Sequence, residues 1–137
     1  MDSVTNTLYE KGLEKYDKYK EDMKTSNAGV SILNQHPKSR IPSYYFTLVE
    51  ASNMLVKGYL SGKGVEISDS RGLITHLSQM SITNVQGLGL DIDTIEIIQT
   101  TQFNEEDDNS FIPFSDYISA LDKLCYSLIS DSKKKGI

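Results

Sequence analysis

The chain has 137 residues, of which 38% are hydrophobic and 24% charged, and its formal net charge is −5. This length suits a single domain with a buried core, and the negative charge disfavours a protein that coats duplex DNA. No apolar run approaches the roughly 20 residues that span a bilayer, and the N-terminus lacks the pattern of a signal peptide. The single cysteine excludes an intramolecular disulfide, so we expect a cytoplasmic protein without membrane contact.

A repeating stripe in the first segment predicts one long helix from about Val4 to Leu33. Its steps alternate between three and four residues, as they do on one face of a helix. Asn27 and Gly29 weaken the last turns, so a kink near Ser26 is expected. Because several stripe positions are small or polar, packing within the chain is favoured over a coiled-coil dimer. The stripe consists of Tyr9, Gly12, Tyr16, Tyr19, Met23, Ser26, Val30 and Leu33.

The second predicted helix is the most apolar part of the chain, and Ser43 is its expected N-cap. Apolar residues cover more than one of its faces, which predicts the most buried helix of the fold. Lys57 lies among them, and we expect it to extend to water or to pair with Glu50. Gly62 and Gly64 are then expected to end this helix, because glycine readily adopts the left-handed conformation of a helix C-terminus.

The middle of the chain is less regular. A short third helix is predicted over residues 69–80, and a connection with Gly87 and Gly89 follows over residues 84–90. Residues 90–102 are compatible with helix or strand, and we favour helix because a lone strand would have no partner.

The last predicted helix begins near Pro113, after an acidic loop at residues 104–109. That loop lacks the spacing of a calcium site, and His36, which precedes a proline in an expected turn, has no ligand neighbours, so no metal is expected. Cys125 lies within the apolar stripe of this helix and is interpreted as a core residue. The domain is predicted to span residues 1–132, followed by a disordered basic tail at residues 133–137.

The segment ASNMLVKGYL, residues 51–60, resembles part of the HEPN-type helical domains. The agreement continues through a glycine-bearing loop into the predicted third helix. Asn53 stands where that family often has glutamate, and Arg71 and Gly72 stand where it often has His-Asp. The matching residues are Lys57, Tyr59, Leu60, Gly64, Leu73 and Leu77.

The resemblance implies an all-α fold, an antiparallel bundle of four main helices plus one short helix, which is often dimeric. It implies one of three roles: an RNase toxin, a nucleotide-binding accessory of a nucleotidyltransferase, or a non-catalytic defence or assembly module. The RNase members use an arginine and a histidine four to six residues apart, a spacing that Arg71 and His76 match. Arg71 would then hold a phosphate, and His76 would deprotonate a ribose hydroxyl.

Three departures favour a structural role for this pair, so no catalytic residue is preferred. Gly72 follows the arginine where a polar residue is usual, Ser78 replaces a usual tyrosine, and the motif lies early in the bundle. Asn53, Lys57 and Arg71 remain the candidate ligand-binding residues.

Three tyrosines share one face of the first helix, which suits a half-exposed groove or a subunit interface, since tyrosine buries area while its hydroxyl stays hydrated. Of the two, we favour a protein interface. These are Tyr9, Tyr16 and Tyr19. We therefore expect a non-enzymatic interaction module, a homodimer that works with a partner protein or a nucleotide and needs no cofactor. The alternatives are a metal-independent RNase that uses Arg71 and His76 on RNA, and a helical adaptor without a nucleotide link.

Overall fold

The computed structural model describes residues 3–25, 36–37, 43–65, 80, 82–90, 93–98, 111–112 and 114–134. Most of these residues are helical, which confirms the all-α fold class. The helices are α1 (Ser3–Thr25), α2 (Ser43–Gly62), α4 (Ile82–Gly87) and α6 (Phe114–Lys134), and residues 93–98 are also helical. No helix in these ranges is long and apolar enough to cross a bilayer.

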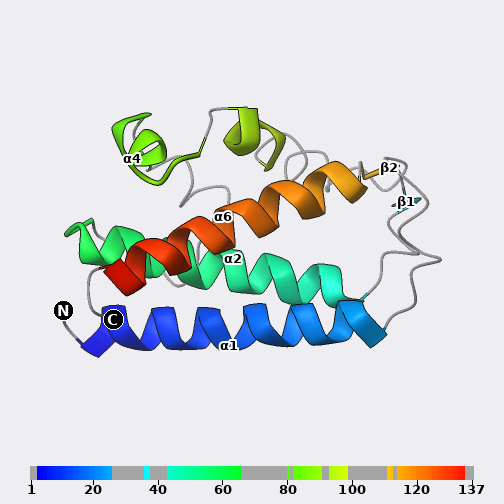
Figure 1. Cartoon of the computed structure of the whole chain (residues 1–137), viewed down its shortest axis with the longest axis horizontal. Coiled ribbons are helices and arrows are strands. Elements are labelled where there is room, and N and C mark those ends of the chain that lie inside the picture. Colours follow the sequence, from blue (N-terminus) through cyan, green and yellow to red (C-terminus); the bar gives the residue numbers. More distant parts are fainter. Residues whose placement is uncertain are drawn as a thin grey trace.

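Helix α2 lies between α1 and α6 (Figure 1). Helix α1 runs in the direction opposite to both α2 and α6, and α4 and residues 93–98 lie beyond α6. The segment that leads into α2 is paired with the segment that leads into α6. Strand β1 (His36–Pro37) pairs antiparallel with strand β2 (Phe111–Ile112), and His36 lies opposite Ile112.

The expected turn at His36 is therefore wrong, because this residue lies in a two-residue strand. Pro37 follows it, and proline is tolerated at such an edge because only one side of the strand needs hydrogen bonds.

Helix α2 forms the centre of the core, as its apolar composition predicted. All residues from Leu55 to Leu60 are buried, so the helix is enclosed on more than one side. Each fully buried leucine side chain contributes about 1.5–3 kcal/mol relative to an exposed one. Its large side chains with the lowest exposure are Tyr45, Leu48, Leu55 and Leu60. The exception is Phe46, which is 53% exposed although it lies in the same apolar run.

Helices α1 and α2 pack closely because of a glycine at their contact. A Cβ atom at Gly12 would lie 2.7 Å from Cγ of Leu55, so only glycine fits this position without a shift. Polar contacts join the same pair of helices on either side of this point. The Thr5 and Ser61 hydroxyls are 2.8 Å apart, and Nζ of Lys15 lies 2.9 Å from a carboxylate oxygen of Glu50.

Two helices end with a glycine in the left-handed conformation. Gly64 has φ 78° after α2, and Gly89 has φ 75° after α4. After α2 the amide of Val65 donates a hydrogen bond to the carbonyl of Leu60 over 3.0 Å. After α4 the amide of Leu90 donates one to the carbonyl of Val85 over 3.1 Å. Such bonds satisfy carbonyls that a helix end leaves unpaired.

The structure corrects the expected connection at residues 84–90, since α4 extends to Gly87. Gly87 and Gly89 were expected to prevent regular structure in this segment. In the structure they lie at the C-terminal end of α4. The expected helix at residues 90–102 is confirmed over residues 93–98.

Helix α6 continues through Lys134, so the expected disorder is wrong for Lys133 and Lys134, and residues 135–137 lie outside the described residues. Lys133 and Lys134 lie in the last turn of α6, where they interact favourably with the negative end of the helix dipole. This interaction favours helix at positions that were predicted to be disordered.

The predicted first helix is described as α1 up to Thr25. Its expected extension to Leu33, the acidic loop at residues 104–109 and all but Met80 of the short helix at residues 69–80 lie outside the described residues.

Candidate functional site

Helix α6 has one apolar face and one polar face. The apolar face is buried in the core, as the stripe predicted, and includes Leu121, Leu124, Cys125 and Leu128 at 0% exposure. The polar face is a row of hydroxyls and lysines at helical spacing that runs along the other side: Ser119, Lys123, Ser127, Ser130 and Lys134. Surface on this side of α6 is therefore available for hydrogen bonds and charge pairs.

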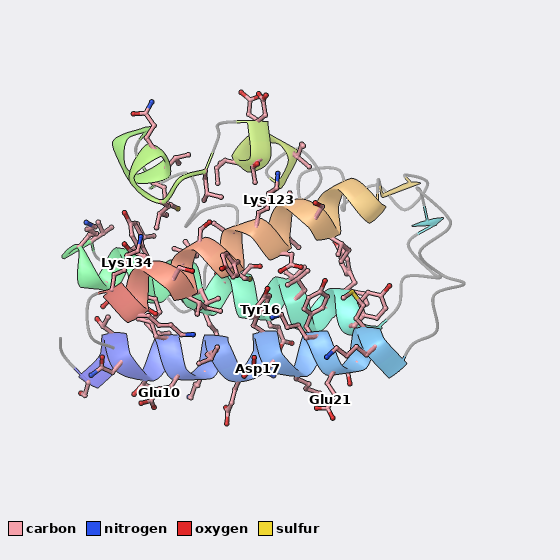
Figure 2. The ribbon with its side chains drawn as sticks, viewed as in Figure 1. Glu10, Tyr16, Asp17, Glu21, Lys123 and Lys134 are labelled. Carbon is pink, nitrogen blue, oxygen red and sulfur yellow. The ribbon has the colours of Figure 1, made fainter. Side chains whose placement is uncertain are left out.

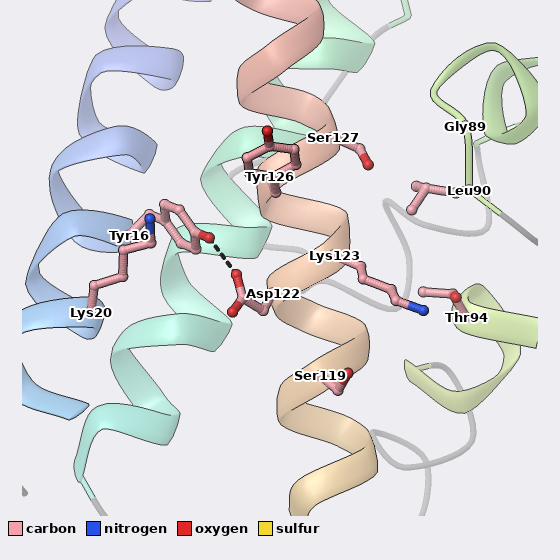
Figure 3. Close-up of a pocket in the computed structure, with 10 residues that line it drawn as sticks. All are labelled: Tyr16, Lys20, Gly89, Leu90, Thr94, Ser119, Asp122, Lys123, Tyr126 and Ser127. Carbon is pink, nitrogen blue, oxygen red and sulfur yellow. Dashed lines mark hydrogen bonds between the residues drawn. The ribbon is translucent and has the colours of Figure 1, made fainter. Parts of the chain in front are cut away.

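A pocket of about 580 Å³ opens over this polar face, between α1, α6 and the residues Gly89, Leu90 and Thr94 (Figure 3). A second pocket of about 320 Å³ adjoins it, since Tyr126 and Ser127 line both. We call the two together the α6 groove. Its lining residues are Tyr16, Lys20, Gly87, Leu88, Gly89, Leu90, Thr94, Ser119, Asp122, Lys123, Tyr126, Ser127, Ser130, Asp131 and Lys134.

One wall of the groove is fixed by a hydrogen bond between α1 and α6. The hydroxyl of Tyr16 donates to the carboxylate of Asp122. Nζ of Lys20 lies 4.7 Å from the centre of the Tyr16 ring, a distance at which a cation is attracted to an aromatic face. Tyr19 stacks on Tyr16 with ring centres 6.0 Å apart. This wall is therefore held by aromatic contacts that reach into the core.

The other wall is formed by residues that precede and begin the helical segment 93–98. Figure 3 shows Lys123 pointing away from Asp122 toward Thr94, with Ser127 on the same side of α6. Tyr126 stands on α6 between these two sides and is 65% exposed. The groove thus offers lysine and hydroxyl donors, an exposed aromatic ring and two carboxylates, of which Asp122 accepts a hydrogen bond from Tyr16.

The titratable groups with clear shifts are poorly suited to proton transfer near neutral pH. Burial, followed by the hydrogen bond to Asp122, raises the pKa of Tyr16. Burial also raises the pKa of Tyr9 and of Tyr19. General acid–base catalysis works best with a pKa near the operating pH. These groups are therefore better suited to donating hydrogen bonds than to exchanging protons.

Cys125 is confirmed as a core residue. It is fully buried, and its sulfur lies 3.2 Å from the hydroxyl of Ser52, which donates to the carbonyl of Leu48. Burial raises the pKa of the Cys125 thiol from 9.0 to about 12. A buried thiol with a raised pKa is a poor nucleophile, because the thiolate is the reactive form.

The expected tyrosine interface is wrong. Tyr9 is 4%, Tyr16 4% and Tyr19 1% exposed, because this face of α1 packs into the core of its own chain. The repeating stripe of the first helix identified the buried face correctly. The stripe alone does not show whether a second copy or the same chain covers this face. Of the three, Tyr16 does reach the candidate site, through its hydroxyl.

Two of the three candidate ligand-binding residues, Asn53 and Lys57, do not line the α6 groove. Asn53 is partly buried and Lys57 is 8% exposed, both on α2, and neither lines the groove. Glu50, the expected partner of Lys57, forms its salt bridge with Lys15. Arg71 and His76, the alternative catalytic pair, lie outside the described residues.

Within the described ranges, no group of three or more His, Cys, Asp or Glu side chains is placed to hold a metal ion. No protein-family model, curated protein or solved structure matches the chain. The function must therefore be inferred from the groove itself.

Sequence reasoning missed Asp122, Lys123 and Tyr126. A signal was present, since hydroxyl and lysine residues recur every three or four positions opposite the apolar stripe of α6. Such rows are common on solvated helix faces. A row of this kind indicates a binding site only when other elements flank it and form a groove.

Proposed function

We propose that this protein is a non-enzymatic interaction module, a HEPN-like helical bundle that associates with itself and with a partner protein or a nucleotide. The α6 groove supports this proposal. It is open and polar, and its exposed aromatic residue, Tyr126, is of a type that is enriched at binding interfaces. Lys123 and Lys134 favour an anionic group on whatever enters.

A binding role fits the chemistry of the groove better than catalysis does. The tyrosine in its wall has a pKa shifted away from neutrality, and its hydroxyl is committed to Asp122. The single cysteine of the chain, Cys125, is fully buried in the core. Donors held in fixed positions can recognise a ligand without exchanging protons with it.

The experiment is a thermal-shift titration of the full chain with ATP, GTP and AMP. A ligand that binds only the folded protein raises Tm in proportion to RT ln(1 + [L]/Kd). We expect a rise that is lost in Tyr126→Ala and kept in Phe46→Ala, a second exposed aromatic residue outside the groove. An unchanged Tm with every nucleotide would favour the adaptor without a nucleotide link, and self-association would then be the remaining activity.

The second candidate function is the metal-independent RNase. It is favoured by one observation, the spacing of Arg71 and His76 in the sequence. Wild type and His76→Ala should be compared for cleavage of a single-stranded RNA in buffer with EDTA. Cleavage by wild type that disappears in His76→Ala would replace the interaction module with the enzyme.

A further inference from the structure

The proposed self-association has a specific geometry, which begins with a row of carboxylates on α1. Four acidic side chains lie along its exposed face at steps of four, three and four residues: Glu10, Glu14, Asp17 and Glu21. At 1.5 Å per residue the row is about 16 Å long. We call it the acidic row. Figure 2 shows Glu10, Asp17 and Glu21 pointing away from α2 and α6.

The α6 groove carries a row with the same spacing. Its members can all donate hydrogen bonds, and lysines stand at both ends: Lys123, Ser127, Ser130 and Lys134. We call it the donor row. Both rows have steps of four, three and four, an order that reads the same in either direction. The two helices can therefore be matched parallel or antiparallel.

We propose that the α6 groove of one copy receives α1 of a second copy, with the acidic row against the donor row. This inference rests on the proposed function. A glutamate then faces a lysine at each end, and Glu14 and Asp17 face the hydroxyls of Ser127 and Ser130. Charge-assisted hydrogen bonds of this kind are stronger than neutral ones. An amphipathic helix laid in a groove is a common form of protein recognition.

Apolar surface is available beside both rows. Tyr126 is 65% exposed next to the donor row, and Leu13 is 38% exposed next to the acidic row. An interface needs such contacts, because exposed ion pairs alone contribute little.

The association is head-to-tail. The acidic row lies on the side of α1 turned away from α6, whereas Lys123 points toward the helical segment 93–98 (Figures 2 and 3). One contact therefore uses different surfaces of the two copies, so that the first copy presents a groove, and the last copy an acidic row, to which a further copy can bind. Such contacts extend into a chain or close into a ring. The dimer expected from the sequence is then the first step of a series.

The experiment is a charge swap followed by sedimentation velocity. One variant carries Glu10→Lys and Glu21→Lys, the other carries Lys123→Glu and Lys134→Glu, and circular dichroism checks that both are folded. Wild type should associate with rising concentration. Each variant alone should associate at least about tenfold more weakly than wild type. An equimolar mixture should associate again, because the intact acidic row of the second variant can meet the intact donor row of the first, and the two altered rows also carry opposite charges.

The matched control for the second variant is Lys11→Glu with Lys18→Glu, which makes the same change of net charge as Lys123→Glu with Lys134→Glu on exposed residues outside both rows. It should associate like wild type. The inference is overturned if wild type remains monomeric, if either swap variant associates like wild type, or if the mixture does not recover. A monomeric wild type that still binds a nucleotide in the groove would overturn this inference alone, whereas loss of both kinds of binding would also overturn the proposed function.

Discussion

Tyr16 joins the core of the molecule to the candidate site. Its ring is buried beside Tyr19, and its hydroxyl donates to Asp122 across the interface of α1 and α6. A single side chain thus fixes the distance between two helices that contact each other little elsewhere.

We expect Tyr16→Phe to destabilise the protein by about 1–2 kcal/mol, because it leaves a carboxylate without its donor while keeping the ring. Urea denaturation measures this change. Tyr126→Phe, which alters an exposed hydroxyl on the same groove, is the control and should shift stability by less than about 0.5 kcal/mol. Equal losses in the two variants would show that the Tyr16 hydroxyl has no special role.

Cys125 gives stability a dependence on alkaline pH. Its pKa is raised from 9.0 to about 12 in the folded protein, so folding holds a proton that the unfolded chain releases. The resulting stability is complete below pH 9 and is lost as pH rises from 9 toward 12, by about 1.4 kcal/mol per pH unit.

Cys125→Ser should remove this contribution, because a serine hydroxyl does not titrate in that range. The free energy of unfolding, measured in urea between pH 8 and 11, should fall less steeply in the variant than in wild type. Tyrosines with raised pKa values add a decline above pH 10 to both proteins. Parallel curves would contradict the assignment.

At the scale of elements, the contact of α1 with α2 depends on a glycine that helix propensity alone disfavours. Gly12 lies against Leu55, which is fully buried and cannot move aside. The glycine is tolerated because close approach of the helices outweighs its cost of about 1 kcal/mol relative to alanine.

Gly12→Ala should therefore destabilise by about 1–3 kcal/mol despite its better propensity, through overpacking. Gly58→Ala is the matched variant, since a Cβ there would lie 3.3 Å from a ring carbon of Tyr9. It should be close to neutral. Thermal unfolding of the two variants distinguishes them, and a Gly12→Ala variant as stable as Gly58→Ala would mean that α1 and α2 are not in close contact.

At the scale of the whole molecule, the sequence predicted what depends on local pattern. The burial of α2 followed from apolar residues on several faces, and the buried side of α6 followed from a single stripe. Gly64 was correctly assigned to a helix end, because glycine readily adopts a positive φ.

What the sequence did not predict depends on contacts between distant segments. Tyr16 and Asp122 are 106 positions apart, and no periodicity indicates that they meet. The tyrosines of α1 were expected at a protein interface because a helix pattern does not identify the surface that covers them. Helix α4 was missed because its glycines were interpreted as breaks, although Gly89 serves as its cap.

The most direct test of a binding role for the α6 groove is residue-resolved NMR of the full chain during dilution. Amide chemical shifts should change with concentration along the acidic row of α1 and the donor row of α6, and those of Leu48, Leu55 and Leu60 in the core of α2 should stay constant. Shifts that do not change with concentration or with added nucleotide, or that change mainly in α2, would contradict the account.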